Sequence, residues 1–243
     1  MIKRKKNATN HRAPMDMIHA TFTCRQSLIL VLLFLPAILI PGCAGQQPSS
    51  NEFQQMCNPV ADAAVAVGDW ETALADHERL LVKEPANCLA LYHLGFIWGY
   101  LGDRDQEIGF YETAVGCGYA SDGQLFFNLG MAYGDIGELD RAVEAFERAV
   151  AINPENPDAH FGLGVTHQKA GRRDEAESAL LRAVSADPLH RYAHLMLVQL
   201  YLDQSRWNEA EAHLETIRRI DPDDEEAEEL RALMRSRRAL EYD

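Results

Sequence analysis

The sulfur-containing side chains are the first candidates for chemistry in this sequence. Its 243 residues include five cysteines, Cys24, Cys43, Cys57, Cys88 and Cys117. A cysteine thiolate can act as a nucleophile, bind a metal or form a disulfide. No Cys-x-x-Cys or Cys-x-x-Cys-His segment occurs, so the spacing supports neither redox catalysis nor haem attachment. The cysteines are therefore candidates for covalent modification and for disulfide formation.

Three histidines form the second group. His160 and His167 are seven residues apart, and His194 lies further along the chain. Three imidazoles on neighbouring helices could bind zinc. However, positions corresponding to His160 and His167 hold Phe126 and Tyr133 earlier in the chain, which indicates that these positions pack against a partner helix. We expect packed, hydrogen-bonded histidines and no bound metal.

The sequence contains no recognised catalytic motif. It has no glycine-rich phosphate loop, no His-Glu-x-x-His segment and no nucleophile elbow. Its many carboxylates are scattered along amphipathic segments, where they are typical of a solvated helix face. We expect neither catalysis nor a cofactor.

The charge of the chain is strongly acidic. The sequence has 37 Asp and Glu against 23 Lys and Arg, a formal net charge of −14. Basic residues are concentrated in the first 42 positions, so the remainder is still more acidic. Such a surface repels phosphate backbones, which argues against nucleic acid as a partner.

The elements that must position these residues are clearest in Gly123–Asn156. Leu129, Gly130 and Tyr133 share one helical face, and Gly137 then marks a turn. A second helical face follows, built from Ala142, Phe146 and Ala149 and ended by Asn153-Pro154. The small residues allow two helices to approach closely, while the large ones fill the space between them. The segment therefore predicts one antiparallel helix pair.

The same pattern returns at intervals of 34 or 35 residues. The turn position is filled by Gly68, Gly102, Gly137, Gly171 and Ser205. The position that ends the second helix is filled by Pro85, Tyr119, Pro154, Pro188 and Pro222. From about Phe53 to Pro222 the chain closely resembles the tetratricopeptide repeat family. The resemblance implies an all-α, right-handed α-solenoid of about five helix pairs over residues 54–224, followed by a capping helix within residues 225–243.

The repeat register brings two cysteines together. Cys88 begins its repeat and Cys117 lies near the end of the same unit, and these two ends of an antiparallel helix pair are adjacent. A Cys88–Cys117 disulfide is therefore expected in an oxidising compartment. A Cys57–Cys88 bond and three buried thiols are the alternatives.

The N-terminal 42 residues have the features of an export signal. Lysines and arginines precede Leu28–Ile40, an uncharged apolar run that is too short to span a bilayer as a helix. Ile40-Pro41-Gly42-Cys43 follows, and it resembles the bacterial lipobox. The resemblance implies cleavage before Cys43 and acylation of that residue. An uncleaved anchor, or an ordinary signal peptide with an incidental cysteine, remain the alternatives.

The residues after this signal indicate where the protein is displayed. Residues 43–53 contain Gly45–Asn51, a stretch without large apolar side chains that is typical of a flexible tether. Ala44 follows the cysteine, and in lipoproteins of bacteria with two membranes this implies export to the outer membrane. We therefore expect a lipid-anchored protein of the cell envelope that faces the periplasm.

The family resemblance also implies a concave groove lined by the first helices of the repeats. The groove positions hold mainly large apolar side chains, namely Tyr92, Phe96, Tyr100, Phe127, Met131, Phe161, Val165, Tyr192 and Leu195. Charges on this side are sparse, and a contiguous apolar surface tends to mark a binding site. Packing between neighbouring first helices, or self-association, are the alternative explanations for this stripe.

The expected function is that of a membrane-tethered scaffold. Its groove would hold a segment of a partner protein, in cell-envelope assembly. The Lys and Asn clamp that some family members use for a peptide carboxylate is missing, which argues against a chaperone-tail receptor. Two alternatives are a module that assembles with itself and a carrier of an apolar molecule.

Overall fold

The structure is a computed structural model that describes residues 58–240. The predicted signal peptide, the tether, Cys43 and Cys57 lie outside these residues. Within them the regular structure consists of helices alone. No helix in this range is long and apolar enough to cross a membrane.

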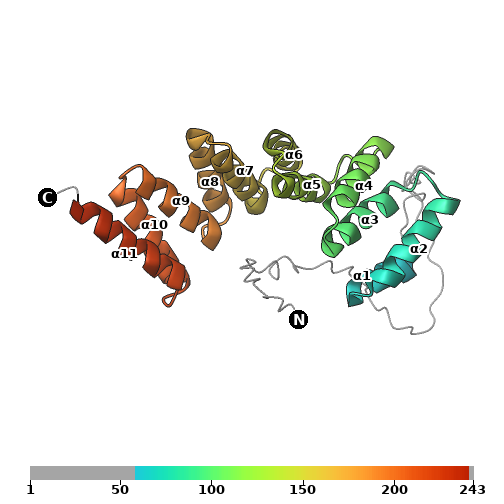
Figure 1. Ribbon diagram of the computed structural model, residues 1–243, viewed down its shortest axis with the longest axis horizontal. Helices are drawn as coiled ribbons and strands as arrows, with labels where there is room; N and C mark the ends of the chain where they lie inside the picture. The colour runs from blue at the N-terminus through green and yellow to red at the C-terminus, as the bar shows by residue number, and fades with distance from the viewer. Residues whose placement is uncertain (1–57, 241–243) are drawn as a thin grey trace, which may run out of the picture. The chain divides into compact units, whose positions relative to one another are not determined.

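Eleven helices make up residues 58–240 (Figure 1). The first helices of the five repeats are α1 (Pro59–Val67), α3 (Cys88–Leu101), α5 (Gly123–Ile136), α7 (Pro157–Lys169) and α9 (Arg191–Asp203). The second helices are α2 (Trp70–Lys83), α4 (Arg104–Cys117), α6 (Leu139–Ile152), α8 (Arg173–Ala186) and α10 (Trp207–Ile220). The last helix is α11 (Glu225–Leu240). From α2 to α10 every helix has 13 or 14 residues, whereas α1 has nine.

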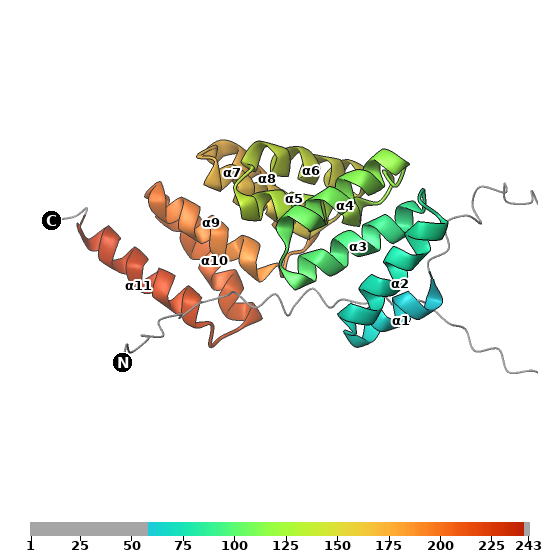
Figure 2. The same cartoon turned by 45° about the vertical axis from the view of Figure 1, so that its right-hand side comes forward.

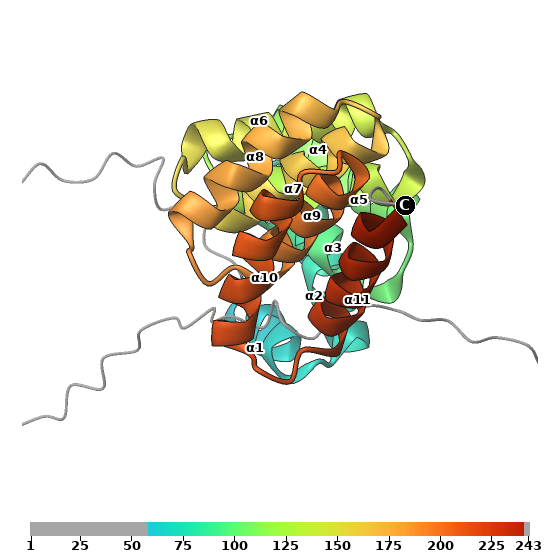
Figure 3. The ribbon, with the colours of Figure 1, turned by 90° about the vertical axis from the view of Figure 1, so that its left-hand side faces the viewer.

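Each first helix packs against the second helix of its own repeat, and each second helix packs against the next first helix (Figure 2). Consecutive first helices also touch from α3 to α9. Helix α11 packs against α9 and α10 and so covers the last repeat (Figure 3). The prediction of an all-α solenoid with five helix pairs and a capping helix is confirmed.

The backbone conformation at the turn position explains why glycine recurs there. All five residues that occupy it have positive φ, from 57° to 86°, and they are Gly68, Gly102, Gly137, Gly171 and Ser205. A residue in the left-handed conformation lets the chain leave one helix and enter the next within two or three residues. Glycine adopts this conformation without steric cost. The recurrence of glycine in the sequence therefore reflects the geometry of the turn.

Small residues in the core make room for large ones. Phe146, on α6, is 2% exposed. A Cβ atom added to Gly130 of α5 would lie 2.9 Å from its ring, and one added to Gly162 of α7 would lie 2.5 Å from it. The phenyl ring therefore fits between two first helices because both present glycine.

The second repeat has a buried carboxylate at a small-residue position, and a glycine and an arginine accommodate it. Glu107 occupies a position that is alanine in the other repeats, and it is buried. Gly99 makes room for its carboxylate, because a Cβ there would lie 2.4 Å from Oε1. Arg104 donates to the Glu107 carboxylate at 2.5 Å and to the carbonyl of Gly99 at 3.2 Å. Burial raises the pKa of Glu107 although Arg104 opposes the shift.

Candidate partner-binding face

Part of the predicted groove belongs to the core. Tyr92, Phe127 and Leu195 are 6% exposed or less. The Tyr92 ring lies 5.8 Å from that of Tyr111, and the Phe127 ring lies edge-on to Phe146 at 5.7 Å. For these three residues the groove hypothesis is wrong in this structure, because the neighbouring helices cover their side chains. They stabilise the stack of repeats instead.

The remaining apolar residues of the stripe are accessible to different degrees. Phe161 and Val165 are half-buried. Four large side chains are between 36% and 58% exposed, and these are Phe96, Tyr100, Met131 and Tyr192. They come from α3, α5 and α9, all of them first helices. The accessible apolar face is therefore smaller than the sequence predicts.

An aromatic patch lies at the N-terminal end of this face. Trp70, at the start of α2, stacks on Tyr100 with 3.9 Å between ring centroids, and its ring lies 6.4 Å from that of Phe96. We call Trp70, Phe96 and Tyr100 the aromatic patch. The sequence indicated only that Trp70 belongs to the second helix of its repeat. Its position directly after the turn Gly68-Asp69 is the signal that places it beside the end of a first helix.

A second aromatic contact lies further along the array. The Phe161 ring, on α7, is 6.4 Å from Tyr192 of α9 and 5.0 Å from His190. His190 Nε2 is 3.2 Å from a carboxylate oxygen of Asp158, and the Arg191 guanidinium lies 5.1 Å over the Tyr192 ring. The aromatic pair Phe161 and Tyr192 is therefore flanked by polar and charged side chains.

Charged residues on the same side have partners within the protein. Asp135 forms an ion pair with Arg104 at 2.7 Å, and Asp203 forms one with Arg237 of α11 at 3.1 Å. Such half-exposed pairs contribute little stability. Both carboxylates are therefore paired with basic groups of the protein itself.

Residues 137–195 and 179–234 match the model of the tetratricopeptide repeat family. This part of the chain belongs to the tetratricopeptide repeat family, and the helix pairs on its N-terminal side have the same arrangement. No curated protein matches its sequence.

Solved structures with the same fold are numerous and distant in sequence. The crystal structure of MamA is 23% identical, with a TM-score of 0.65, over 69% of this chain and 97% of MamA. YrrB, described as a tetratricopeptide repeat protein with an unusual peptide-binding site, is 24% identical with a TM-score of 0.65, over 75% of this chain and 95% of YrrB. A tetratricopeptide repeat protein from Parabacteroides merdae is 21% identical with a TM-score of 0.63, over 72% and 69% of the two chains. At these identities the likeness concerns the fold.

In this repeat protein Cys88 and Cys117 form a disulfide, with 5.5 Å between their Cα atoms. The bond joins the start of α3 to the end of α4, as the repeat register predicts. It leaves neither cysteine for a bond to Cys57.

The histidines considered for zinc are used in packing. His160 and His194, at equivalent places in α7 and α9, are buried. Each ring has its Nε2 within hydrogen-bonding distance of the carbonyl of the proline that ends the preceding helix pair, at 2.8 Å from Pro154 and 3.1 Å from Pro188. His194 Nδ1 also lies 2.7 Å from His213 Nδ1 on α10. His160 and His194 are thus packed and hydrogen-bonded, as expected.

A hollow of about 620 Å³ is lined by none of the exposed apolar residues of this face. It is formed by the turn and first residues of α6 together with Ala170 and Arg172, and its lining includes Glu138 and Asp140. Arg172 forms an ion pair with Asp140 there at 2.9 Å. A hollow with this charged lining does not favour an apolar ligand.

Proposed function

We propose that this protein is a scaffold that holds a segment of another protein against the exposed part of its first-helix face. The observation that carries the proposal is the set of exposed apolar side chains Phe96, Tyr100, Met131 and Tyr192. Large apolar side chains that share one face and remain exposed are typical of an interaction surface. YrrB, which has the same fold and a peptide-binding site, supports a peptide segment as the bound element.

The energy available on this face is sufficient for a transient complex. A large apolar side chain that a partner covers fully contributes up to about 1.5–3 kcal/mol, before the cost of ordering both partners. Four half-covered side chains with added backbone hydrogen bonds can reach micromolar affinity, on the order of 8 kcal/mol. The partner segment is expected to be apolar or aromatic, with few acidic residues, because the chain carries a net charge of −14.

We further propose that the scaffold is anchored to a membrane of the cell envelope through an acylated Cys43. The support is the sequence alone, namely the apolar run Leu28–Ile40 and the lipobox-like segment that ends at Cys43. Acyl chains contribute about 0.8 kcal/mol per buried methylene, so a multiply acylated cysteine holds a protein on a membrane persistently. Replacing Cys43 with alanine in the full-length chain should move the protein from the membrane fraction to the soluble fraction. Membrane retention of the variant would refute this anchor.

The binding face is tested by crosslinking and pull-down from membranes. The informative variant is Phe96→Ala with Tyr100→Ala, because both residues are exposed and their loss leaves the buried core intact. Phe127→Ala is unsuitable, since Phe127 is buried and its removal would leave a cavity. The matched control is Val82→Ala with Leu181→Ala, two exposed apolar residues on the second helices.

A protein recovered with the wild type and the control, and lost with the Phe96/Tyr100 variant, would support the scaffold. Recovery of the same proteins with all three chains would refute the proposed face. Recovery of this protein alone, with a solution mass above that of one chain, would assign the face to self-association.

A further inference from the structure

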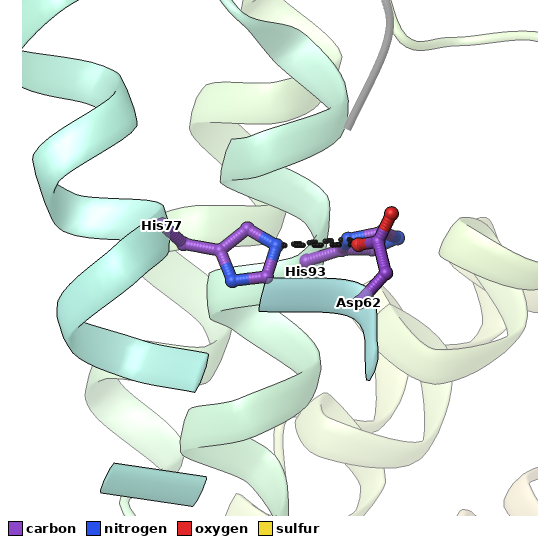
Figure 4. A group of neighbouring side chains, drawn as sticks. All are labelled: Asp62, His77 and His93. Atoms are coloured by element: carbon purple, nitrogen blue, oxygen red, sulfur yellow. Dashed lines mark hydrogen bonds and ion pairs between the residues drawn. The ribbon is translucent and has the colours of Figure 1, made fainter. Parts of the chain in front are cut away.

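A group of three side chains between the first and second repeats has an arrangement that the scaffold does not require. Asp62 lies on α1, His77 on α2 and His93 on α3, and their polar atoms point toward one another (Figure 4). His93 Nδ1 is 3.1 Å from Asp62 Oδ1 and 3.1 Å from His77 Nε2, and the third separation, His77 Nε2 to Asp62 Oδ1, is 3.6 Å. Three helices therefore each contribute one possible ligand atom to one point.

These separations fit a tetrahedral metal centre. Zinc binds histidine nitrogen and carboxylate oxygen at about 2.0–2.2 Å, so two ligand atoms of a tetrahedral site lie about 3.3–3.5 Å apart. The three separations in the structure, 3.1, 3.1 and 3.6 Å, average close to that value. The set of two imidazoles and one carboxylate also suits a divalent first-row transition metal.

A backbone contact prepares His77 to act as a ligand. Its Nδ1 lies 2.7 Å from the carbonyl oxygen of Ala73, one turn earlier on α2. A carbonyl only accepts hydrogen bonds, so Nδ1 carries the proton and donates it. The lone pair is then on Nε2, which is the nitrogen that faces Asp62 and His93. Histidines that bind metals commonly have their second nitrogen fixed by such a contact.

A comparison of equivalent positions in the repeats shows that the combination of one aspartate and two histidines occurs only between α1, α2 and α3 among the described residues. The position of His77 is filled in the later repeats by Tyr111, Phe146, Leu180 and Leu214, all of them buried. The position of Asp62 is filled by Phe96, Met131, Val165 and Gln199. The position of His93 is filled by Asn128, Gly162 and Met196. In the next interface the equivalent pair is joined by a neutral hydrogen bond of 3.3 Å between Asn128 and the Tyr111 hydroxyl.

The place of the group in the fold indicates what a metal would do there. Helix α1 has nine residues and no repeat before it within residues 58–240. The buried apolar cluster of this region contains only Ala64, Ala73 and Ile97, which have little surface to bury. A metal bound to α1, α2 and α3 together would hold this weakly packed end in place.

We propose that Asp62, His77 and His93 bind one Zn²⁺ ion, which clips α1 and α2 onto α3. His77 is the buried ligand, with a side chain that is fully inaccessible, whereas the Asp62 side chain is 40% exposed. The ion therefore enters from the Asp62 side, and a water molecule completes its coordination there. The site uses none of the three residues of the aromatic patch, so Zn²⁺ binding can be measured separately from partner capture.

The test uses the untagged full-length chain, stripped of metal with a chelator and dialysed. Titration with Zn²⁺ followed by calorimetry should show one ion per chain, and Co²⁺ should give the visible absorption of a tetrahedral site. Bound Zn²⁺ should raise the thermal midpoint, because it binds only the folded arrangement. Asp62→Asn and His93→Asn should each weaken Zn²⁺ binding by about 100-fold or more.

Two further variants separate loss of the metal from loss of the fold. His77→Leu places at this position the residue found in the fifth repeat, where Leu214 packs although Val198 takes the place of the first-helix glycine. It should therefore remove Zn²⁺ binding while the chain stays helical. His167→Asn changes a half-buried histidine outside the group and should bind Zn²⁺ like the wild type. The proposal is overturned if the wild type binds no stoichiometric Zn²⁺, or if Asp62→Asn binds it as tightly as His167→Asn does. The three side chains would then form a hydrogen-bonded group only.

Discussion

The helix pairs α1–α2 and α5–α6 occupy equivalent places in the repeat but fill the space between their helices by different means. In α5–α6 the ring of Phe146 is enclosed by Gly130 and Gly162, so the contact is apolar and close. In α1–α2 the corresponding residue is His77, which faces Asp62 and His93. The inner pair has a neighbour on both sides, whereas α1 has one on a single side within residues 58–240. A repeat with less surface to bury thus has polar contacts where the inner repeats have apolar ones.

The second repeat lies between these two cases. It has the apolar core residue Tyr111, and it also has the Cys88–Cys117 disulfide. The second repeat thus combines an apolar core with a covalent bond between its helix ends. Four measurements would break or sharpen this comparison, and they are given in order of decreasing expected effect.

Phe146→Ala should have the largest effect, a loss of about 3–5 kcal/mol in the free energy of unfolding, because a fully enclosed ring leaves a cavity between two glycines. Urea unfolding followed by circular dichroism measures it. His77→Ala should cost clearly less, since the first repeat can separate without opening the inner core. Equal losses for the two variants would contradict the difference between the repeats.

Replacing Cys88 and Cys117 together with serine should lower stability by roughly 3.6 kcal/mol, because the bond closes a loop across a sequence separation of 29 residues. Reduction of the wild type should produce a similar decrease in the urea midpoint. The double variant itself should be insensitive to reductant, which controls for other effects of the reagent.

Lowering the pH should destabilise the C-terminal end of the array through His213. Burial, with a smaller contribution from His194, lowers the pKa of His213 to about 4. The unfolded chain takes up this proton near pH 6.5 while the folded chain does not, so stability decreases as the pH falls from about 6.5 to 4 and is constant above that window. The loss should be on the order of 3 kcal/mol in total. His213→Leu should reduce the dependence of the unfolding free energy on pH over this range, to which His77, His167 and His194 also contribute because burial lowers their pKa values too. An unchanged slope would contradict this prediction.

Gly162→Ala should have the smallest effect, about 1–3 kcal/mol, because its methyl group would meet the Phe146 ring. Gly134→Ala is the control, since a Cβ at that position meets no atom within 4 Å. Combining Gly162→Ala with Phe146→Leu should recover part of the loss. Thermal unfolding of the four chains distinguishes these outcomes.

Much of the fold could be predicted because repetition supplies internal evidence. The positive φ at Gly68 and its equivalents favours glycine, which fills four of the five turn positions, so the turns are visible in the sequence. Cys88 and Cys117 could be paired because the repeat register fixes which helix ends meet. By contrast, the burial of Tyr92 and Phe127 depends on how closely adjacent helices approach, and periodicity alone does not determine that distance.

The group of Asp62, His77 and His93 was missed for a related reason. Each residue, taken by itself, is an ordinary polar residue on a helix, and the three are not close in sequence. The available signal was their position, since His77 occupies a place that is otherwise filled by Tyr111, Phe146 and Leu180. A polar side chain at a repeat position that is elsewhere large and apolar is a useful marker for such a site.

The disulfide has a further consequence for how the chain responds to a protease. The turn at Gly102-Asp103 lies inside the loop that Cys88 and Cys117 close. Cleavage there would divide the sequence into two fragments, but the sulfur–sulfur bond would still join them. A nicked molecule should therefore migrate as one species in a non-reducing gel and separate into two after reduction. Binding surfaces on either side of the cleavage site would therefore remain in one covalently linked molecule.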